Sequence, residues 1–76
     1  MIRSEKLNTT DVRCGAFEGN PVRYTDIESW IFDYNGKWRE WQSTGEILTN
    51  AHRLTKDAFE RDYPNLPPLP AEAFPK

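Results

Sequence analysis

The chain has 76 residues, 13% of them aromatic and 29% charged, and a formal net charge of −2 at pH 7. This composition is typical of one small folded domain with a thin core, and it excludes a disordered chain and a strongly basic duplex-binding protein. The chain contains one cysteine and one histidine, which excludes an internal disulfide and a zinc site built from a Cys/His cluster.

The first predicted strand follows a polar segment. Residues 1–10 are expected to form a flexible lead-in, and residues 11–63 a single α+β domain. Residues 11–17 alternate apolar and polar side chains, which is the period of a half-buried strand. Residues 18–21, Glu-Gly-Asn-Pro, provide turn residues, so residues 22–24 can return as a second short strand.

Residues 29–42 carry the strongest hairpin signal in the chain. Asn35 and Gly36 lie between aromatic and β-branched residues, and both tolerate the positive φ that tight hairpin turns need. A helix over residues 25–42 is the alternative, because apolar residues also recur there at helical spacing and Thr25 with Glu28 resembles a capping box. The hairpin is favoured, because Asn-Gly in mid-helix would cost roughly 1.5 kcal/mol relative to alanines.

The hairpin can adopt two registers, which place different aromatic residues on the same face. A two-residue turn pairs Trp30 with Trp41 and leaves Trp38 on the opposite face. A three-residue loop pairs Asp33 with Lys37 and leaves Trp41 on the opposite face. In that second register one face groups three rings: Trp30, Phe32 and Trp38. The sequence leaves both registers open.

Residues 43–63 are predicted to form one amphipathic helix. Ser43 and Glu46 have the spacing of a capping box, and Pro64 marks the end. A shorter helix capped by Thr55 is the alternative, and it would free residues 45–53 for another strand. The expected fold is therefore α+β: a small antiparallel sheet of three to four strands with a central Asn-Gly hairpin, packed against one C-terminal amphipathic helix. The apolar residues share one half of that helix: Ile47, Leu48, Ala51, Leu54, Ala58, Phe59 and Tyr63.

Residues 64–76 form a proline-rich tail, which is expected to be extended and similar to polyproline II. Residues 67–70, Pro-Pro-Leu-Pro, resemble a WW-domain ligand, and the spacing of Arg61, Pro64 and Pro67 resembles an SH3-domain ligand. These resemblances imply a tail that contacts another protein through five residues: Leu66, Pro67, Pro68, Leu69 and Pro70. The favoured interpretation is that Leu66, Leu69 and Phe74 fold back over the core.

No catalytic, cofactor-binding or metal-binding site is predicted. Cys14 and His52 could act together as nucleophile and base, but a lone cysteine on a strand is more often a small core residue. The chain has no paired-acid motif and no glycine-rich phosphate loop. A domain this thin is also expected to lack room for a pocket of ~300 Å³. These observations argue against an enzyme.

The favoured function is a non-enzymatic protein–protein interaction module, a small regulator or inhibitor of a partner protein. Its size, acidity and lack of a catalytic set suit the accessory proteins of phages and mobile elements, by analogy alone. A homodimer formed through exposed aromatics or a sheet edge is compatible with this function. An exposed Trp beside charged residues is typical of a binding hot spot, so five residues of the hairpin are expected to bind the partner: Lys37, Trp38, Arg39, Glu40 and Trp41.

The alternative function, from another class, is binding of single-stranded nucleic acid. Aromatic rings interleaved with cations can stack on bases, and five residues form such a set: Trp30, Phe32, Lys37, Arg39 and Trp41. The isoelectric point of about 5.3 and the interspersed acidic residues make nucleic acid the less favoured partner.

A cytoplasmic location is expected. The N-terminal residues carry no apolar stretch of the kind that directs secretion. No segment approaches the ~18 apolar residues that a membrane span needs, so no membrane partner is predicted.

Overall fold

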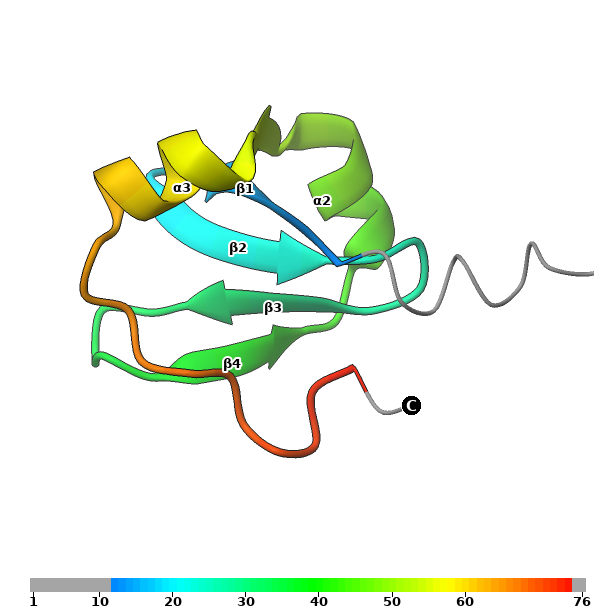
Figure 1. The fold of residues 1–76 in the computed structure, drawn as a ribbon. Helices are drawn as coiled ribbons and strands as arrows, with labels where there is room; N and C mark the ends of the chain where they lie inside the picture. Colours follow the sequence, from blue (N-terminus) through cyan, green and yellow to red (C-terminus); the bar gives the residue numbers. More distant parts are fainter. Residues whose placement is uncertain (1–11, 75–76) are drawn as a thin grey trace, which may run out of the picture.

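The computed structural model describes residues 12–74, and the lead-in predicted at residues 1–10 lies outside them. The α+β class is confirmed, with an antiparallel sheet and two short helices (Figure 1). Among the described residues, neither helix has the length and apolar character needed to cross a membrane. The elements in chain order are β1 (Arg13–Phe17), β2 (Asn20–Tyr24), β3 (Ser29–Phe32), β4 (Trp38–Trp41), α2 (Thr44–Asn50), β5 (His52–Leu54) and α3 (Lys56–Asp62).

The sheet has five strands in the order β4-β3-β2-β1-β5. Strands β1 to β4 form a meander, in which each strand pairs with the next through a short connection. Strand β5 then returns to the far edge and pairs antiparallel with β1, with Cys14 opposite Leu54. The expected number of three to four strands is therefore wrong, because β5 lies inside the segment that was predicted to be helical.

The β3–β4 hairpin confirms the three-residue loop. The Asp33 backbone N–H donates to the Lys37 carbonyl at 2.9 Å, and strand pairing places Phe32 opposite Trp38. Gly36 has a φ of +79°, which a residue without a Cβ adopts without strain. The Asp33 carboxylate also accepts the backbone N–H of Lys37 at 3.2 Å and so fixes the loop from inside. The two-residue register and the helix over residues 25–42 are both wrong.

The single helix over residues 43–63 is also wrong, because the segment divides into α2, β5 and α3. Ala51, at the end of α2, has extended backbone angles (φ −74°, ψ 145°), and the next three residues pair with the otherwise open edge of β1. A new helix then begins after Thr55, whose hydroxyl accepts the Ala58 N–H at 3.1 Å. The alternative helix capped by Thr55 is confirmed, although of residues 45–53 only His52 and Arg53 lie in a strand and residues 45–50 lie in α2. Gly45, Thr49 and Asn50 have low helix propensity, which favours an early end of α2.

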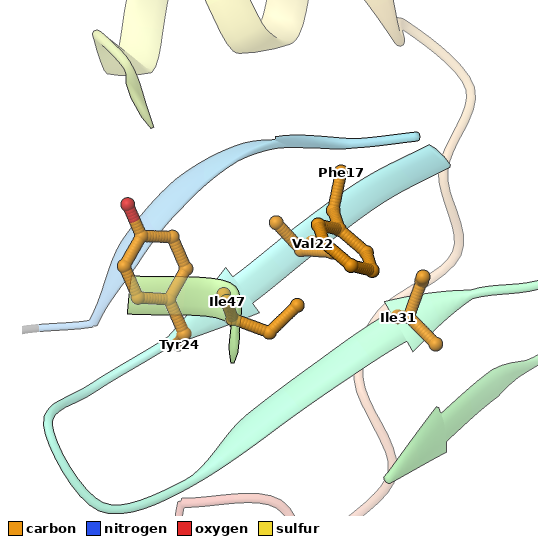
Figure 2. Close-up of a cluster of buried hydrophobic side chains, with 5 residues drawn as sticks. All are labelled: Phe17, Val22, Tyr24, Ile31 and Ile47. Carbon is orange, nitrogen blue, oxygen red and sulfur yellow. The ribbon is translucent and has the colours of Figure 1, made fainter. Parts of the chain in front are cut away.

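The hydrophobic core lies between the sheet and α2. Ile47 projects from α2 onto the middle of the sheet and is completely buried (Figure 2). Its neighbours come from three consecutive strands: Phe17, Val22, Tyr24 and Ile31. Trp41 packs at the border of this cluster, with its ring 5.7 Å from the Phe17 ring in an edge-to-face arrangement. This face of the sheet, called here the α2 face, is a closed apolar layer.

The opposite face of the sheet is covered by α3 and the tail. Side chains alternate along β1 and β2, so Cys14 and Arg23 point away from Val22 and the core cluster. Phe59 of α3 is buried on this side, where its ring lies 5.9 Å from the Arg23 guanidinium. After α3 the chain continues past the end of the β3–β4 hairpin and along β4 (orange to red in Figure 1). This side is called here the tail face.

Candidate interaction site

Three aromatic residues of the hairpin meet on the tail face. Trp30 and Phe32 lie two residues apart on β3, and Trp38 is directly opposite Phe32 on β4. The Phe32 and Trp38 rings lie 5.3 Å apart in an edge-to-face arrangement. Trp30 is 5% exposed, whereas Phe32 and Trp38 are half-buried. Trp30, Phe32 and Trp38 are called here the aromatic face.

The tail is attached to the aromatic face by polar contacts. The Trp38 indole Nε1–H donates to the Pro67 carbonyl at 2.9 Å. Further along, the Phe74 backbone N–H donates to the Glu28 carboxylate at 2.9 Å, and the same carboxylate oxygen accepts the Trp30 indole N–H at 2.6 Å. Residues 64–74 of the tail contain no helix or strand. Five of them are half-buried: Leu66, Leu69, Pro70, Ala73 and Phe74.

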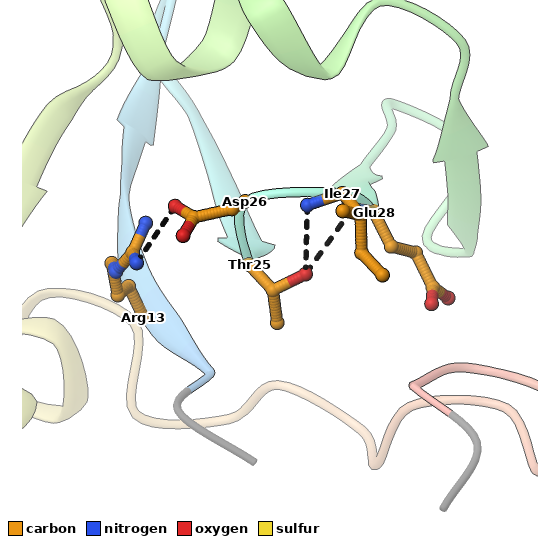
Figure 3. Close-up of polar contacts among 5 residues, drawn as sticks. All are labelled: Arg13, Thr25, Asp26, Ile27 and Glu28. Carbon is orange, nitrogen blue, oxygen red and sulfur yellow. Dashed lines mark hydrogen bonds and ion pairs between the residues drawn. The ribbon is translucent and has the colours of Figure 1, made fainter. Parts of the chain in front are cut away.

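Glu28 is held in position by the β2–β3 turn. The buried Thr25 hydroxyl accepts the backbone N–H groups of Ile27 and Glu28, each at 3.2 Å (Figure 3). Arg13 of β1 pairs with Asp26 of the same turn at 2.9 Å. Glu28 was not predicted as a tail contact, because the spacing of Thr25 and Glu28 was considered only as the capping box of the alternative helix. Here the Thr25 hydroxyl organises a turn with the same acceptor chemistry.

The five hairpin residues predicted to bind a partner do not share one surface. Trp38 and Glu40 point to the tail face, and Arg39 and Trp41 point to the α2 face, because side chains alternate along β4. Lys37, Arg39 and Glu40 are exposed, whereas both tryptophans are half-buried. The Arg39 guanidinium lies 5.6 Å from the Trp41 ring. Only Trp38 and Glu40, with Lys37 at the loop, can act together beside the tail.

Trp41 carries a buried polar atom without a partner. Its indole Nε1 has no hydrogen-bond acceptor, and it is the one side-chain nitrogen or oxygen in this condition within residues 12–74. A buried donor left unpaired costs about 1–3 kcal/mol. The rest of the ring compensates through apolar contact with the core, so Trp41 acts as a packing residue at the border of the α2 face.

The residues proposed for single-stranded nucleic acid are likewise divided between the two faces. Trp41 lies on the α2 face, whereas Trp30 and Phe32 lie beneath the tail. Base stacking needs an open aromatic surface with cations beside it. The described chain has no such surface on the hairpin.

A cleft of about 510 Å³ lies between α3, the tail and the sheet. The expectation that this domain lacks room for a pocket is therefore wrong, because the tail crosses the tail face without filling it. Its floor contains Cys14, Arg23 and Trp38, and α3 contributes Phe59. The remaining lining residues are Val12, Lys56, Glu60, Tyr63, Pro64, Leu66, Pro67, Pro68 and Leu69.

Cys14 and His52 do not form a catalytic pair. Cys14 is buried, and its Sγ donates to the Leu54 carbonyl at 3.5 Å. Burial raises the pKa of the Cys14 thiol above its ordinary value, which disfavours the nucleophilic thiolate. His52 is exposed on β5 opposite Ala16 and does not line the cleft. Within residues 12–74, no group of three or more His, Cys, Asp or Glu side chains is arranged to hold a metal ion.

In comparisons with known proteins, no protein-family model, curated protein or solved structure matches the chain.

Proposed function

We propose that this chain is a non-enzymatic protein–protein interaction module that binds an extended, proline-rich segment of a partner protein on its aromatic face. One observation supports this function above the others. The tail, a proline-rich segment, lies on that face with its Pro67 carbonyl bonded to the Trp38 indole. The chain would act as a small regulator or inhibitor by occupying such a segment of its partner.

The chemistry of this contact suits recognition of proline. A polyproline-II segment has no internal hydrogen bonds, so its carbonyls are free to accept a donor from outside. An indole provides that donor beside a flat apolar surface, against which a pyrrolidine ring can pack. Aromatic-lined grooves that bind proline-rich segments use the same combination, and the stiffness of the segment limits the entropy lost on binding.

The surroundings of the aromatic face can select the partner. Lys37, next to Trp38 in the loop, and Glu40, on the same side of β4 as Trp38, are exposed and carry opposite charges. Charges at the border of an interface contribute mainly to orientation and to the rejection of wrong partners. A partner segment with an acidic residue near Lys37 and a basic residue near Glu40 would fit this pattern.

The chain's own tail competes with any partner for the aromatic face. A segment on a short linker has an effective concentration in the millimolar range. A free peptide of the same sequence must therefore reach ~mM concentrations, and a natural partner must bind more tightly than the tail.

The test is a titration of the full chain, labelled with ¹⁵N, with a synthetic peptide of the tail sequence, residues 64–76. A Leu69→Ser variant weakens the chain's own tail and should lower the peptide concentration needed. In this variant the indole N–H signal of Trp38 is expected to lie away from its wild-type position and to return toward it as the peptide is added, while that of Trp41, on the other face, stays constant. If several millimolar peptide leaves Trp38 unchanged in the folded Leu69→Ser variant, the aromatic face is not a peptide-binding site.

Homodimerisation remains a prediction within this proposal. Strand β4 is an edge of the sheet, and an edge strand can pair with a second copy. Sedimentation of the full chain at increasing concentration would detect that pairing.

A further inference from the structure

The cleft between α3 and the tail carries a second inference, which does not rest on the proposed function. We propose that this cleft is a binding site for a small aromatic carboxylic acid, with the Arg23 guanidinium binding the carboxylate and the aromatic and proline side chains enclosing the ring. The cleft shares Trp38 with the aromatic face, but it is open while the tail stays in place, so a ligand can enter it without displacing the tail.

Arg23 is the central group of this site. It is the next-to-last residue of β2, is half-buried, and is fixed by the bond from its Nε–H to the Arg13 carbonyl at 3.3 Å. Its guanidinium lies 5.9 Å from the Phe59 ring, which orients the planar group. Within residues 12–74 no carboxylate forms an ion pair with Arg23, and its two terminal amino groups donate no hydrogen bond. A planar guanidinium with free terminal donors binds a carboxylate through two parallel hydrogen bonds.

The charges around the cleft favour an anion. Two cations, Arg23 and Lys56, and one carboxylate, Glu60, line it. The lining therefore has a formal charge of +1, although the whole chain has a net charge of −2.

The walls of the cleft favour a flat apolar body. Trp38, Phe59 and Tyr63 contribute three rings, and prolines of the tail also line the cleft. The volume of about 510 Å³ lies within the range of small-molecule sites, which is roughly 300–1,000 Å³.

The experiment uses the full chain and two matched probes, 2-naphthoate and its neutral analogue 2-naphthamide. Calorimetry is expected to give an affinity for naphthoate that exceeds the affinity for naphthamide by about tenfold, the usual scale of a charge-assisted carboxylate contact. Arg23→Gln should remove this preference, and Arg23→Lys should reduce it, because lysine keeps the charge but not the fork of two donors. Arg53→Gln, which changes an exposed cation outside the lining of the cleft, should leave the preference in place.

The only cysteine of the chain provides a second readout, since Cys14 lines the cleft. Saturating naphthoate should slow the alkylation of Cys14 by iodoacetamide in wild-type protein and leave it unchanged in Arg23→Gln. Equal affinity for the two probes, or the same preference in folded Arg23→Gln, would overturn the proposal. Alkylation that naphthoate does not slow would place the probe elsewhere and overturn it too. None of these results depends on the peptide titration, which does not require Arg23.

Discussion

The two faces of the sheet are closed in different ways. On the α2 face, Ile47 inserts among apolar side chains of three strands, and a hydroxyl pair, Ser29 and Thr44 at 2.9 Å, joins α2 to β3. On the tail face, an irregular segment is attached through the indole of Trp38 and the carboxylate of Glu28, and it leaves a cleft beneath it. The α2 face thus provides stability through burial, whereas the tail is held by few specific contacts, which under the proposed function a partner would replace. A domain with a thin core can carry a binding surface when one face of its sheet provides the stability and the opposite face provides the binding contacts.

The largest expected effect concerns the α2 face. Ile47→Ala removes a completely buried side chain and should lower the free energy of unfolding by about 2–5 kcal/mol. Leu48→Ala, the neighbouring residue on α2 with 44% exposure, is the control and should cost far less. Urea denaturation of both variants measures the difference. Similar losses for the two would show that the α2 face is not the stabilising one.

The second prediction concerns the edge of the sheet where β5 pairs with β1. A Cβ added at Gly15 would lie 2.4 Å from the His52 carbonyl oxygen, so Gly15→Ala must displace β5 and should cost about 1–3 kcal/mol. A Cβ at Gly45 in α2 meets no atom within 4 Å, and Gly45→Ala should stabilise the protein by about 0.5–1 kcal/mol. The midpoint temperature of thermal unfolding should therefore fall for Gly15→Ala and rise for Gly45→Ala, although both substitutions add the same methyl group. A neutral Gly15→Ala would contradict the close approach of the two strands.

The third prediction compares the two helices. Thr55→Ala removes the hydroxyl that caps α3 and should cost about 0.5–2 kcal/mol. Ser43→Ala at the start of α2 removes a side chain that makes no capping hydrogen bond, so its cost should be smaller. Hydrogen exchange of the amides in α3 would separate local fraying from global unfolding. Equal effects at both positions would weaken the assignment of α3 as a separately capped helix.

The fourth prediction compares one substitution on the two faces. Trp38→Phe removes the donor to the Pro67 carbonyl and should cost about 0.5–1.5 kcal/mol, with faster exchange of the tail amides. Trp41→Phe removes an indole N–H that has no partner. The stability lost through weaker packing is therefore offset by the stability gained when the unpaired donor is removed. Chemical denaturation should show Trp41→Phe as the milder variant, and the reverse order would contradict the roles given to the two rings.

The smallest expected effect is a pH dependence at Cys14. Burial raises the pKa of this thiol, so the folded state favours the neutral form. The neutral thiol therefore contributes to the stability of the folded state. This contribution is fully present below the pKa of a thiol in the unfolded chain, about 8.5, and is lost as the pH rises through the higher pKa of the folded state. The free energy of unfolding of wild type should therefore fall more than that of Cys14→Ala between about pH 8 and 10. Parallel curves for the two proteins would show that the thiol titrates normally.

The hairpin was predictable from the sequence, and the chain after it was less so. Local turn chemistry at Asn35 and Gly36 identified the β3–β4 connection, but the choice of register depended on Asp33, whose backbone and carboxylate close the three-residue loop. The apolar period of residues 43–63 suited one long helix. That period cannot reveal that the edge of β1 lacks a partner, and pairing with that edge is what makes His52–Leu54 a strand.

The candidate site was predictable only in part. Trp38 was identified as a residue that could contact a partner, and its contact with Pro67 joins it to the tail residues that were also singled out. Trp41 was included because the register was left open and the three-residue register exposed it in place of Trp38, whereas in the structure it packs at the border of the core under α2. Arg23 carried no sequence signal, since its role depends on Phe59, which lies 36 positions later and reaches it only through the packing of α3.

The pairing of β1 with β5 has a consequence for the order of folding. Cys14 and Leu54 are separated by 40 residues, whereas each strand of the β1–β4 meander contacts the next through a short turn. Closing a long loop costs more chain entropy than closing a short one, so the meander should form before β5 docks. During synthesis the aromatic face would therefore be assembled before α3 and the tail have emerged to cover it. A chaperone that recognises exposed aromatic surface would meet this protein in that interval, and slow translation of residues 52–74 would prolong it.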